Sequence, residues 1–308
     1  MAAICLYLSL RGVDWRHVWE AIRRARGVWL WCAAGITAFS LTVRALRWRI
    51  LLNAEASLRF GTVFRANMVG YLGNNFLPAR AGEVLRSMLI SRDSTLSNTY
   101  ALTTALSERL MDVIAVILAA ALALFALRSK PAWMTDLSRG MAAVAIAGAL
   151  AIAILPHTGG LIDAVIARLP LPERIRKFLL KTADQILLGI RAFHHWGRLA
   201  GFAALTAVVW SADGVTVIVG ARALGLSIPP PIAMLLLTAM ALGSALPSTP
   251  GYVGIYQLAA VMVLGPAGIS RDEALAYSFL GQAVSYVVVA ALGLPSLYLS
   301  YRPRKGAK

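Results

Sequence analysis

Two short polar stretches interrupt a chain that is otherwise rich in Leu, Ala, Val and Ile. They read "NNFLPARAGEVLR" and "SERLMD", and their charged residues are Arg80, Glu83, Arg86, Glu108, Arg109 and Asp112. Side chains three or four residues apart lie on roughly one side of a helix, so each stretch gathers charge on one face. Burying one such charge at the centre of a bilayer costs about 2.5–3.5 kcal/mol on insertion scales, which favours pairing. We therefore expect Glu108 or Asp112 to pair with Arg80 or Arg86.

The chemistry that these groups suit best is the binding of phosphate. Arginine presents a planar fork of donors that matches phosphate oxygens, and Asn74 and Asn75 add further donors. A helix that starts near Ala79 would direct its free N–H groups and its positive dipole end at the same place. We expect Arg80 and Arg86 to hold the phosphate of a lipid headgroup. The alternative is that the charged pairs only tie two helices together.

The remaining charges of this candidate site have supporting roles. Glu83, Glu108 and Asp112 are expected to orient the arginines, and they could contact an amine if the headgroup carries one. Arg109 belongs to the same group. Four charges lie elsewhere. Asp213 is expected to pair with a neighbouring arginine, and Arg44, Arg47 and Arg49 are expected to reach the headgroup region from a helix end.

A second stretch, "LPSTPGYVG", offers hydroxyls and a nearby amide but no charge. The second broken-helix site is expected at Ser248, Thr249, Pro250, Gly251, Tyr252 and Gln257, where the hydroxyls and the amide would complete the site by hydrogen bonding. Tyr252 and Tyr256 fit equally well as aromatic residues at the membrane interface. "NNFLPARAGEVLR" and "LPSTPGYVG" each contain Leu-Pro with Gly five residues after the Leu. Such breaks free backbone groups that hydrocarbon cannot satisfy. Paired interruptions of this kind predict a binding site between two halves of the protein.

Composition identifies the class of protein. Hydrophobic residues make up 59% of the chain and charged residues 14%, and the mean hydropathy is +0.70. A soluble domain of this length would need more charge on its surface. Several apolar runs approach the ~20 residues that cross a bilayer as a helix, so we predict an all-α polytopic membrane protein with about 6–8 membrane segments.

The expected organisation is a single domain over residues 1–308, built from two pseudo-repeats, each with a broken or re-entrant helix. The first pseudo-repeat covers about residues 28–127 and the second about 199–301, with a basic surface elbow at about 157–198 between them. The predicted helical segments are residues 14–26, 28–52, 60–76, 79–90, 98–127, 138–155, 199–224, 231–246, 255–264 and 272–301.

Other function classes find little support in the sequence. The net charge is +16, but the basic residues fall between the apolar runs, where cytoplasmic loops meet anionic lipid. We therefore expect no nucleic-acid partner. Cys5 and Cys32 form no metal-binding motif, and His194–His195 lacks nearby acidic or Cys ligands, so no metal is expected. No P-loop is visible, and we expect no cofactor. Gln282 is expected to hydrogen-bond between helices.

At these residues the chain resembles a known family, the lysylphosphatidylglycerol synthase transmembrane region, also called the flippase-like membrane domain. "NNFLPARAGEVLR" is close to the family's first motif, "ERLMD" to the acidic element that follows it, and "LPSTPGYVG" to its Pro-x-x-Pro-Gly element. "VRALRWRILL" is similar to its Arg-x-x-Arg-Trp helix end. The chain departs from the pattern at Tyr252, where Gly is usual, and at Gln257, where an acid is usual. The resemblance implies a lipid-translocating or lipid-associated membrane domain, here without a synthase domain.

The function expected from the sequence is translocation of a phospholipid, hopanoid or other lipid between leaflets of the bacterial inner membrane, without catalysis. A scaffold or accessory factor in lipid, hopanoid or glycan-lipid synthesis is the first alternative, with a lipid-synthesis enzyme as a partner. A membrane-embedded enzyme acting on a headgroup is disfavoured, because Ser107 next to Glu108 has no His base within the membrane. Oligomeric state is left open.

Overall fold

The computed structural model describes residues 6–7, 9–77, 80–126, 132–154, 168, 172–191, 193, 195–245 and 250–301, and every regular element among them is helical. The helices are α2 (Trp15–Arg23), α3 (Gly27–Leu52), α4 (Phe60–Phe76), α5 (Ala81–Asp93), α6 (Asn98–Ala126), α7 (Ala132–Ile154), α9 (Glu173–Arg191), α10 (Trp196–Ala223), α11 (Pro230–Ala245), α12 (Ile255–Leu264) and α13 (Arg271–Tyr301). Two short 3-10 turns, η4 (Pro250–Tyr252) and η5 (Gly265–Ala267), flank α12. The predicted all-α class is confirmed.

Among the described residues, three helices are long and apolar enough to cross a membrane, namely α3, α10 and α13. Large apolar side chains on such helices face outward, among them Trp31 and Val287, which are 81% and 67% exposed. A soluble protein would bury side chains of this size, whereas lipid chains can cover them. The outward apolar surface is therefore consistent with a membrane protein.

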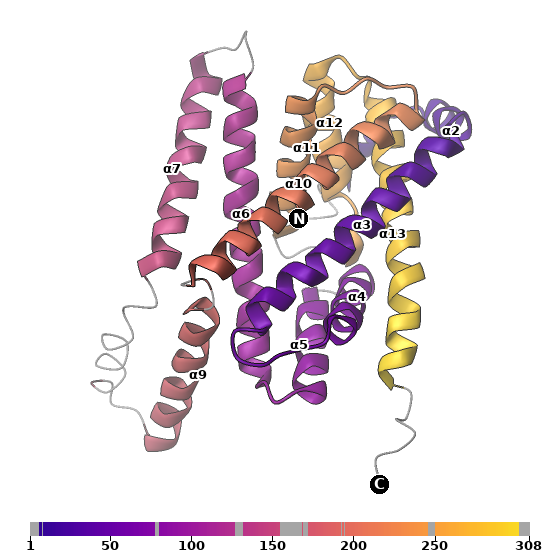
Figure 1. Cartoon of the computed structure of the whole chain (residues 1–308). Coiled ribbons are helices and arrows are strands. Elements are labelled where there is room, and N and C mark those ends of the chain that lie inside the picture. Colours follow the sequence, from indigo (N-terminus) through magenta and orange to yellow (C-terminus); the bar gives the residue numbers. More distant parts are fainter. Residues whose placement is uncertain are drawn as a thin grey trace.

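The helix α2 lies at one end of the molecule, beside the start of α13 (Figure 1). The carboxylate of Asp14 caps it by accepting hydrogen bonds from the backbone N–H groups of Arg16 and His17, at 2.9 and 3.4 Å. These backbone bonds hold the pKa of Asp14 below its usual value. Val18 is buried against α13, while Trp19 stays exposed on the other side. The helical segment predicted at residues 14–26 is confirmed over Trp15–Arg23.

Two helical hairpins, α4–α5 and α11–α12, enter the molecule from opposite ends (Figure 1). Even the longer helix of each, α4 or α11, measures only about 25 Å, less than the ~30 Å hydrocarbon thickness of a bilayer. The sequence explains the first break. Leu77 is extended, at φ −101° and ψ 144°, as expected for a residue that precedes a proline. The tips of the hairpins meet near the middle of the molecule, where α4 contacts η4.

A long helix, a helical hairpin and a second long helix follow one another twice along the chain. The first set is α3, α4–α5 and α6, and the second set is α10, α11–α12 and α13. Helices of one set pack against helices of the other. α3 packs along α10, α4 packs against α13, and α11 packs against α6 (Figure 1). Each hairpin is therefore held by the long helix of the other set.

The buried apolar residues form matching cores in the two sets. One cluster gathers Trp48, Leu52 and Val63 with residues of α5 and α6. Another gathers Val217, Leu236 and other residues of α10–α13. Each cluster thus joins one hairpin to the long helices beside it.

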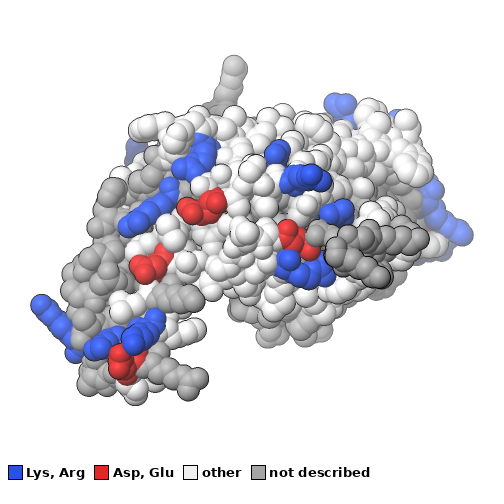
Figure 2. Space-filling view, turned by 60° about the horizontal axis from the view of Figure 1, so that its bottom comes forward, with Lys and Arg blue, Asp and Glu red and all other residues white. Residues whose placement is uncertain are grey.

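The elbow expected at about residues 157–198 is described only in part, and its described portion includes the amphipathic helix α9, which packs against α6. Figure 2 shows this end of the molecule, where Lys and Arg side chains are spread over the surface. Arg59, Arg92 and Lys177 are exposed there or partly so. Such a surface suits contact with anionic lipid headgroups.

Candidate functional site

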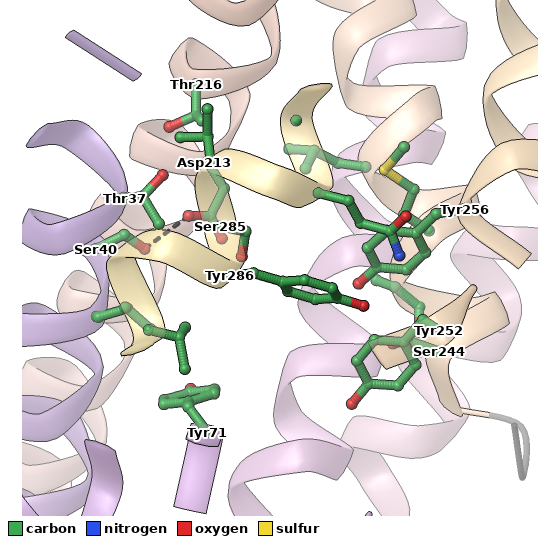
Figure 3. Close-up of a pocket in the computed structure, with 18 of the residues that line it drawn as sticks. Thr37, Ser40, Tyr71, Asp213, Thr216, Ser244, Tyr252, Tyr256, Ser285 and Tyr286 are labelled. Carbon is green, nitrogen blue, oxygen red and sulfur yellow. Dashed lines mark hydrogen bonds between the residues drawn. The ribbon is translucent and has the colours of Figure 1, made fainter. Parts of the chain in front are cut away.

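A cavity of about 550 Å³ lies between the two hairpin tips and the long helices around them. Its polar lining includes residues from both hairpins and from α3, α6, α10 and α13; Figure 3 labels Thr37, Ser40, Tyr71, Asp213, Thr216, Ser244, Tyr252, Tyr256, Ser285 and Tyr286. The remaining lining is apolar. The cavity thus combines a polar centre with surfaces that suit hydrocarbon.

Arg80 stands at the tip of the first hairpin, directly before α5. Its backbone is left-handed, at φ 55°, a conformation that costs a non-glycine residue on the order of 1–3 kcal/mol and is concentrated at functional sites. The guanidinium reaches the second hairpin, where it donates to the carbonyl oxygen and the hydroxyl of Ser244 and lies 5.8 Å from the ring centre of Tyr252. Its Nε is buried and has no hydrogen-bond partner within the part of the chain that the structure describes.

Arg109 and Glu83 form the wall beside Arg80. Arg109 Nε lies 3.0 Å from Glu83 Oε1, and Arg109 Nη1 lies 3.4 Å from Asp112 Oδ2. Arg109 also donates to the hydroxyl of Tyr71 at 3.3 Å. The charges of this wall are thus already neutralised by one another.

Arg47 lies behind this wall and is the centre of the charged network. Its side chain is 0% exposed. Nη2 pairs with Glu108 Oε1 at 2.9 Å, Nη1 pairs with Asp112 Oδ1 at 2.6 Å, and the guanidinium lies 4.9 Å from the ring centre of Phe202. The expectation that Arg47 extends to the headgroup region is wrong, because Glu108 and Asp112 face it from α6.

Arg44, one turn earlier on α3, also turns inward. It pairs with Asp213 of α10 and lies 3.8 Å from Asp112. Asp213 also accepts a hydrogen bond from Ser40 at 2.6 Å (Figure 3). The predicted pairing of Asp213 with an arginine is confirmed, while the expected extension of Arg44 to the headgroups is wrong. Arg49 instead donates to the carbonyl of Leu58 at 2.7 Å.

Arg86 is paired with carboxylates inside the protein. It lies 3.1 Å from Glu108 Oε2 and 2.6 Å from Glu83 Oε2, and it donates to Asn67 at 2.8 Å. The predicted pairing between Arg86 and Glu108 is confirmed, whereas Arg80 pairs with neither Glu108 nor Asp112 among the described ion pairs.

The second hairpin contributes aromatic hydroxyls to the cavity. The rings of Tyr252 and Tyr256 are stacked, with centres 5.4 Å apart and planes 13° apart. Tyr286 of α13 donates to the carbonyl of Gly251 at 2.7 Å and projects between the two walls (Figure 3). Gly251 has φ +67°, and a Cβ there would fall 1.7 Å from the Tyr286 hydroxyl, so a glycine is required.

The candidate residues from the sequence divide into three groups. Those that line the cavity are Asn74, Asn75, Arg80, Glu83, Arg109, Asp112, Gly251 and Tyr252. Arg86, Glu108 and Gln257 are buried behind it rather than lining it. Ser248 and Thr249 lie outside the described residues, and only the backbone of Pro250, which opens η4, is described.

Sequence reasoning overlooked Arg44, Ser40 and Tyr286 as lining residues. Ser40, Arg44 and Arg47 are spaced four and three residues apart, so they form one polar stripe along α3. That spacing was the signal that could have placed them inside the protein. Tyr286 has no such pattern around it.

Gln257 is expected to be structural. Its Oε1 accepts from the backbone N–H of Gly254 at 2.7 Å, and its Nε2 donates to Gln282 at 2.7 Å, which confirms the interhelical role predicted for Gln282. Gln257→Leu would leave these buried groups unpaired and should destabilise the protein by about 1–3 kcal/mol. The measurement is the free energy of unfolding in detergent. Met262→Leu, at a 66% exposed position of the same helix, is the matched control and should unfold like wild type. Equal stability of Gln257→Leu and wild type would contradict the role.

Comparison with known proteins gives two findings. The family model described as "Lysylphosphatidylglycerol synthase TM region" matches residues 1–293 of the chain. The chain is also similar to the protein named glycosyltransferase AglD from Haloferax volcanii, with 23% identity over 334 residues. The match covers 96% of this chain and 53% of that protein, so the chain spans about half the length of this curated relative. No solved structure matches the chain.

Proposed function

Because the chain belongs to the family of the lysylphosphatidylglycerol synthase transmembrane region, we propose that it binds the phosphate of a membrane lipid in the central cavity and moves the headgroup between leaflets. The lipid is translocated without chemical change in this proposal. Its acyl chains stay in the surrounding bilayer, next to the apolar part of the cavity lining.

The observation that carries this proposal is the set of contacts that Arg80 makes. The other arginines of the network each meet at least one carboxylate, whereas Arg80 holds only Ser244 and the face of Tyr252 among the described residues. Its guanidinium lines the cavity, and none of the described residues accepts a hydrogen bond from its Nε. A lipid phosphate supplies both the negative charge and the acceptor oxygens that this group needs.

The arrangement of the hairpins supports a path across the membrane. They enter from opposite ends and meet at the cavity (Figure 1). We place α3, α6, α7, α10 and α13 across a bacterial cytoplasmic membrane, with both hairpins re-entrant. We also infer that the two sets, residues 27–126 and 196–301, are pseudo-repeats, since exchanging α3, α4 and α6 for α10, α11 and α13 turns each packing pair into another observed pair.

Replacing Arg80 with alanine should slow lipid translocation about tenfold to a hundredfold, since a hydrogen bond to a charged group contributes about 1.5–3 kcal/mol. Arg80→Lys keeps the charge but lacks the planar fork of donors, so its translocation rate should lie between those of wild type and Arg80→Ala. The measurement is dithionite quenching of acyl-labelled phospholipid in proteoliposomes that contain purified protein.

Arg16→Ala is the matched control, because the Arg16 side chain is 87% exposed and Arg16 is distant in sequence from most of the residues that line the cavity. It should move lipid at the wild-type rate. If folded Arg80→Ala also moves lipid at that rate, the site is wrongly assigned. If wild type is no faster than protein-free vesicles, translocation itself is wrong.

A second candidate is an accessory role in glycan-lipid synthesis, with a lipid-synthesis enzyme as partner. The similarity to a protein named as a glycosyltransferase favours it. Because the chain spans about half of that relative, the named activity is not carried over. Deletion of the gene that encodes this protein would separate the two proposals. An accessory role predicts loss of a glycan-lipid product in isolated membranes even when translocation in proteoliposomes is absent.

A further inference from the structure

We propose that the cavity selects a lipid whose headgroup carries one phosphodiester charge and hydroxyl groups, and that it discriminates against headgroups with an amine. This inference rests on the proposed function, because it names the class of lipid that the same cavity would take. It is carried by the balance of charge around the cavity and by the kind of polar atoms left unpaired there.

The charges of the network leave an excess of one positive group. The described residues of the network are Arg44, Arg47, Arg80, Arg86, Arg109, Glu83, Glu108, Asp112 and Asp213. Five are arginines and four are carboxylates, so the network carries a formal net charge of about +1. A phosphodiester bears one negative charge, which balances that excess.

An ammonium group would find no available carboxylate in this network. Glu83 meets Arg86 and Arg109, at 2.6 and 3.0 Å. Asp112 meets Arg47 at 2.6 Å, and Asp213 meets Arg44. The remaining carboxylate, Glu108, is 0% exposed. An amine would therefore have to displace an arginine or stay without a carboxylate partner, and either outcome costs free energy.

The unpaired polar atoms of the described cavity lining include both donors and acceptors. Arg80 Nε and Trp210 Nε1 are buried N–H donors without a partner among the described residues, and Ser278 Oγ is buried without one as well. Two acceptors are also unpaired: Asn74 Oδ1, to which a headgroup hydroxyl could donate, and Glu83 Oε2, which lies 2.6 Å from an Arg86 nitrogen. Trp210 and Ser278 are 9% and 2% exposed. Phosphate and hydroxyl oxygens can accept from these groups, whereas an ammonium group has donors only.

The wall opposite Asp213 suits a hydroxylated headgroup. Tyr252, Tyr256 and Tyr286 present phenolic hydroxyls there, and Ser244 lies beside them (Figure 3). Hydroxyl groups both donate and accept, so a glycerol or sugar moiety could exchange hydrogen bonds with this wall. The stacked rings of Tyr252 and Tyr256 add a flat apolar face. The matching headgroup is thus a phosphodiester joined to a polyol.

The test uses two acyl-labelled lipids that differ in the headgroup, phosphatidylglycerol and phosphatidylethanolamine, in the same proteoliposomes. Phosphatidylglycerol should be moved about tenfold faster, since one charge-assisted contact is at stake. Binding is measured separately, as the rise in unfolding temperature of the detergent-purified protein with short-chain forms of each lipid.

Two variants examine the residues behind the preference. Arg80→Gln removes the excess positive charge and should abolish the preference for phosphatidylglycerol in both measurements. Trp210→Phe keeps an aromatic ring near Arg44 but removes the indole donor, so it should lower the preference severalfold. Trp31→Phe, at an 81% exposed position, is the control and should leave the preference unchanged.

The outcomes separate this inference from the proposed function. If both lipids move equally fast and stabilise the protein equally, the selectivity is overturned while translocation stands. If neither lipid moves but phosphatidylglycerol alone stabilises the protein, translocation fails and the selectivity of the site stands. A preference for phosphatidylethanolamine, or a preference unaffected by Arg80→Gln, would overturn the charge argument.

Discussion

Replacing Arg47 with alanine is expected to destabilise the protein by about 3–5 kcal/mol, because it leaves two buried carboxylates without their shared partner. Arg47 is 0% exposed and is paired with both Glu108 and Asp112. In a bilayer neither carboxylate can be rehydrated cheaply. The measurement is reversible denaturation of the purified protein in mixed micelles, followed by intrinsic fluorescence.

The cause can be separated from loss of packing by a charge-balanced variant. Arg47→Met combined with Asp112→Asn removes one charge of each sign and should recover a large part of the lost stability, since neutral replacement of a buried pair is often tolerated. Arg16→Ala, on the exposed surface, should unfold like wild type. If the double variant is no more stable than Arg47→Ala, the loss comes from the contact with Phe202 and not from the uncompensated charge.

Local sequence signals predicted the helices well. The expected segments 60–76 and 255–264 match α4 and α12 at both ends. The first ends where Leu77 must become extended before a proline, and the second begins after Gly254, which has φ +93°. Other boundaries shifted by a few residues, as for the segment 138–155, which begins at Ala132 in the structure. Such ends depend on capping and packing, which a short window of sequence does not contain.

The partners of the charged residues were harder to predict, because they lie far apart in the sequence. Arg47 meets residues 61 and 65 positions away, and Arg44 meets Asp213 169 positions away. Near a helix end, reaching outward to water is the economical choice for an arginine with no other partner. Only the contact of α3 with α6 and α10 supplies partners inside the protein. The candidate phosphate contact accordingly moved to Arg80 alone, with Arg86 held by Glu83 and Glu108.

Gly82→Ala is expected to cost about 3 kcal/mol or more, at the upper end of the range for overpacked sites. A Cβ at this position would lie 1.9 Å from the carbonyl oxygen of Gly70 and 2.5 Å from Asn74 Oδ1. Neither can move away freely, since Gly70 belongs to the backbone of α4. The α4–α5 hairpin would have to open, which would displace Arg80 at its tip. Lipid translocation should therefore fall together with stability.

The matched control is Gly35→Ala, because Gly35 lies inside helix α3 and a Cβ there meets nothing within 4 Å. This substitution should be neutral or stabilise the protein by up to about 1 kcal/mol, as alanine favours a helix over glycine. Both variants are compared by mixed-micelle unfolding and by proteoliposome transport. A Gly82→Ala protein with wild-type stability would show that the two helices are not in close contact at this position. A stable variant that has lost transport would instead place the effect at Arg80, and so tie the geometry of the hairpin tip directly to headgroup binding.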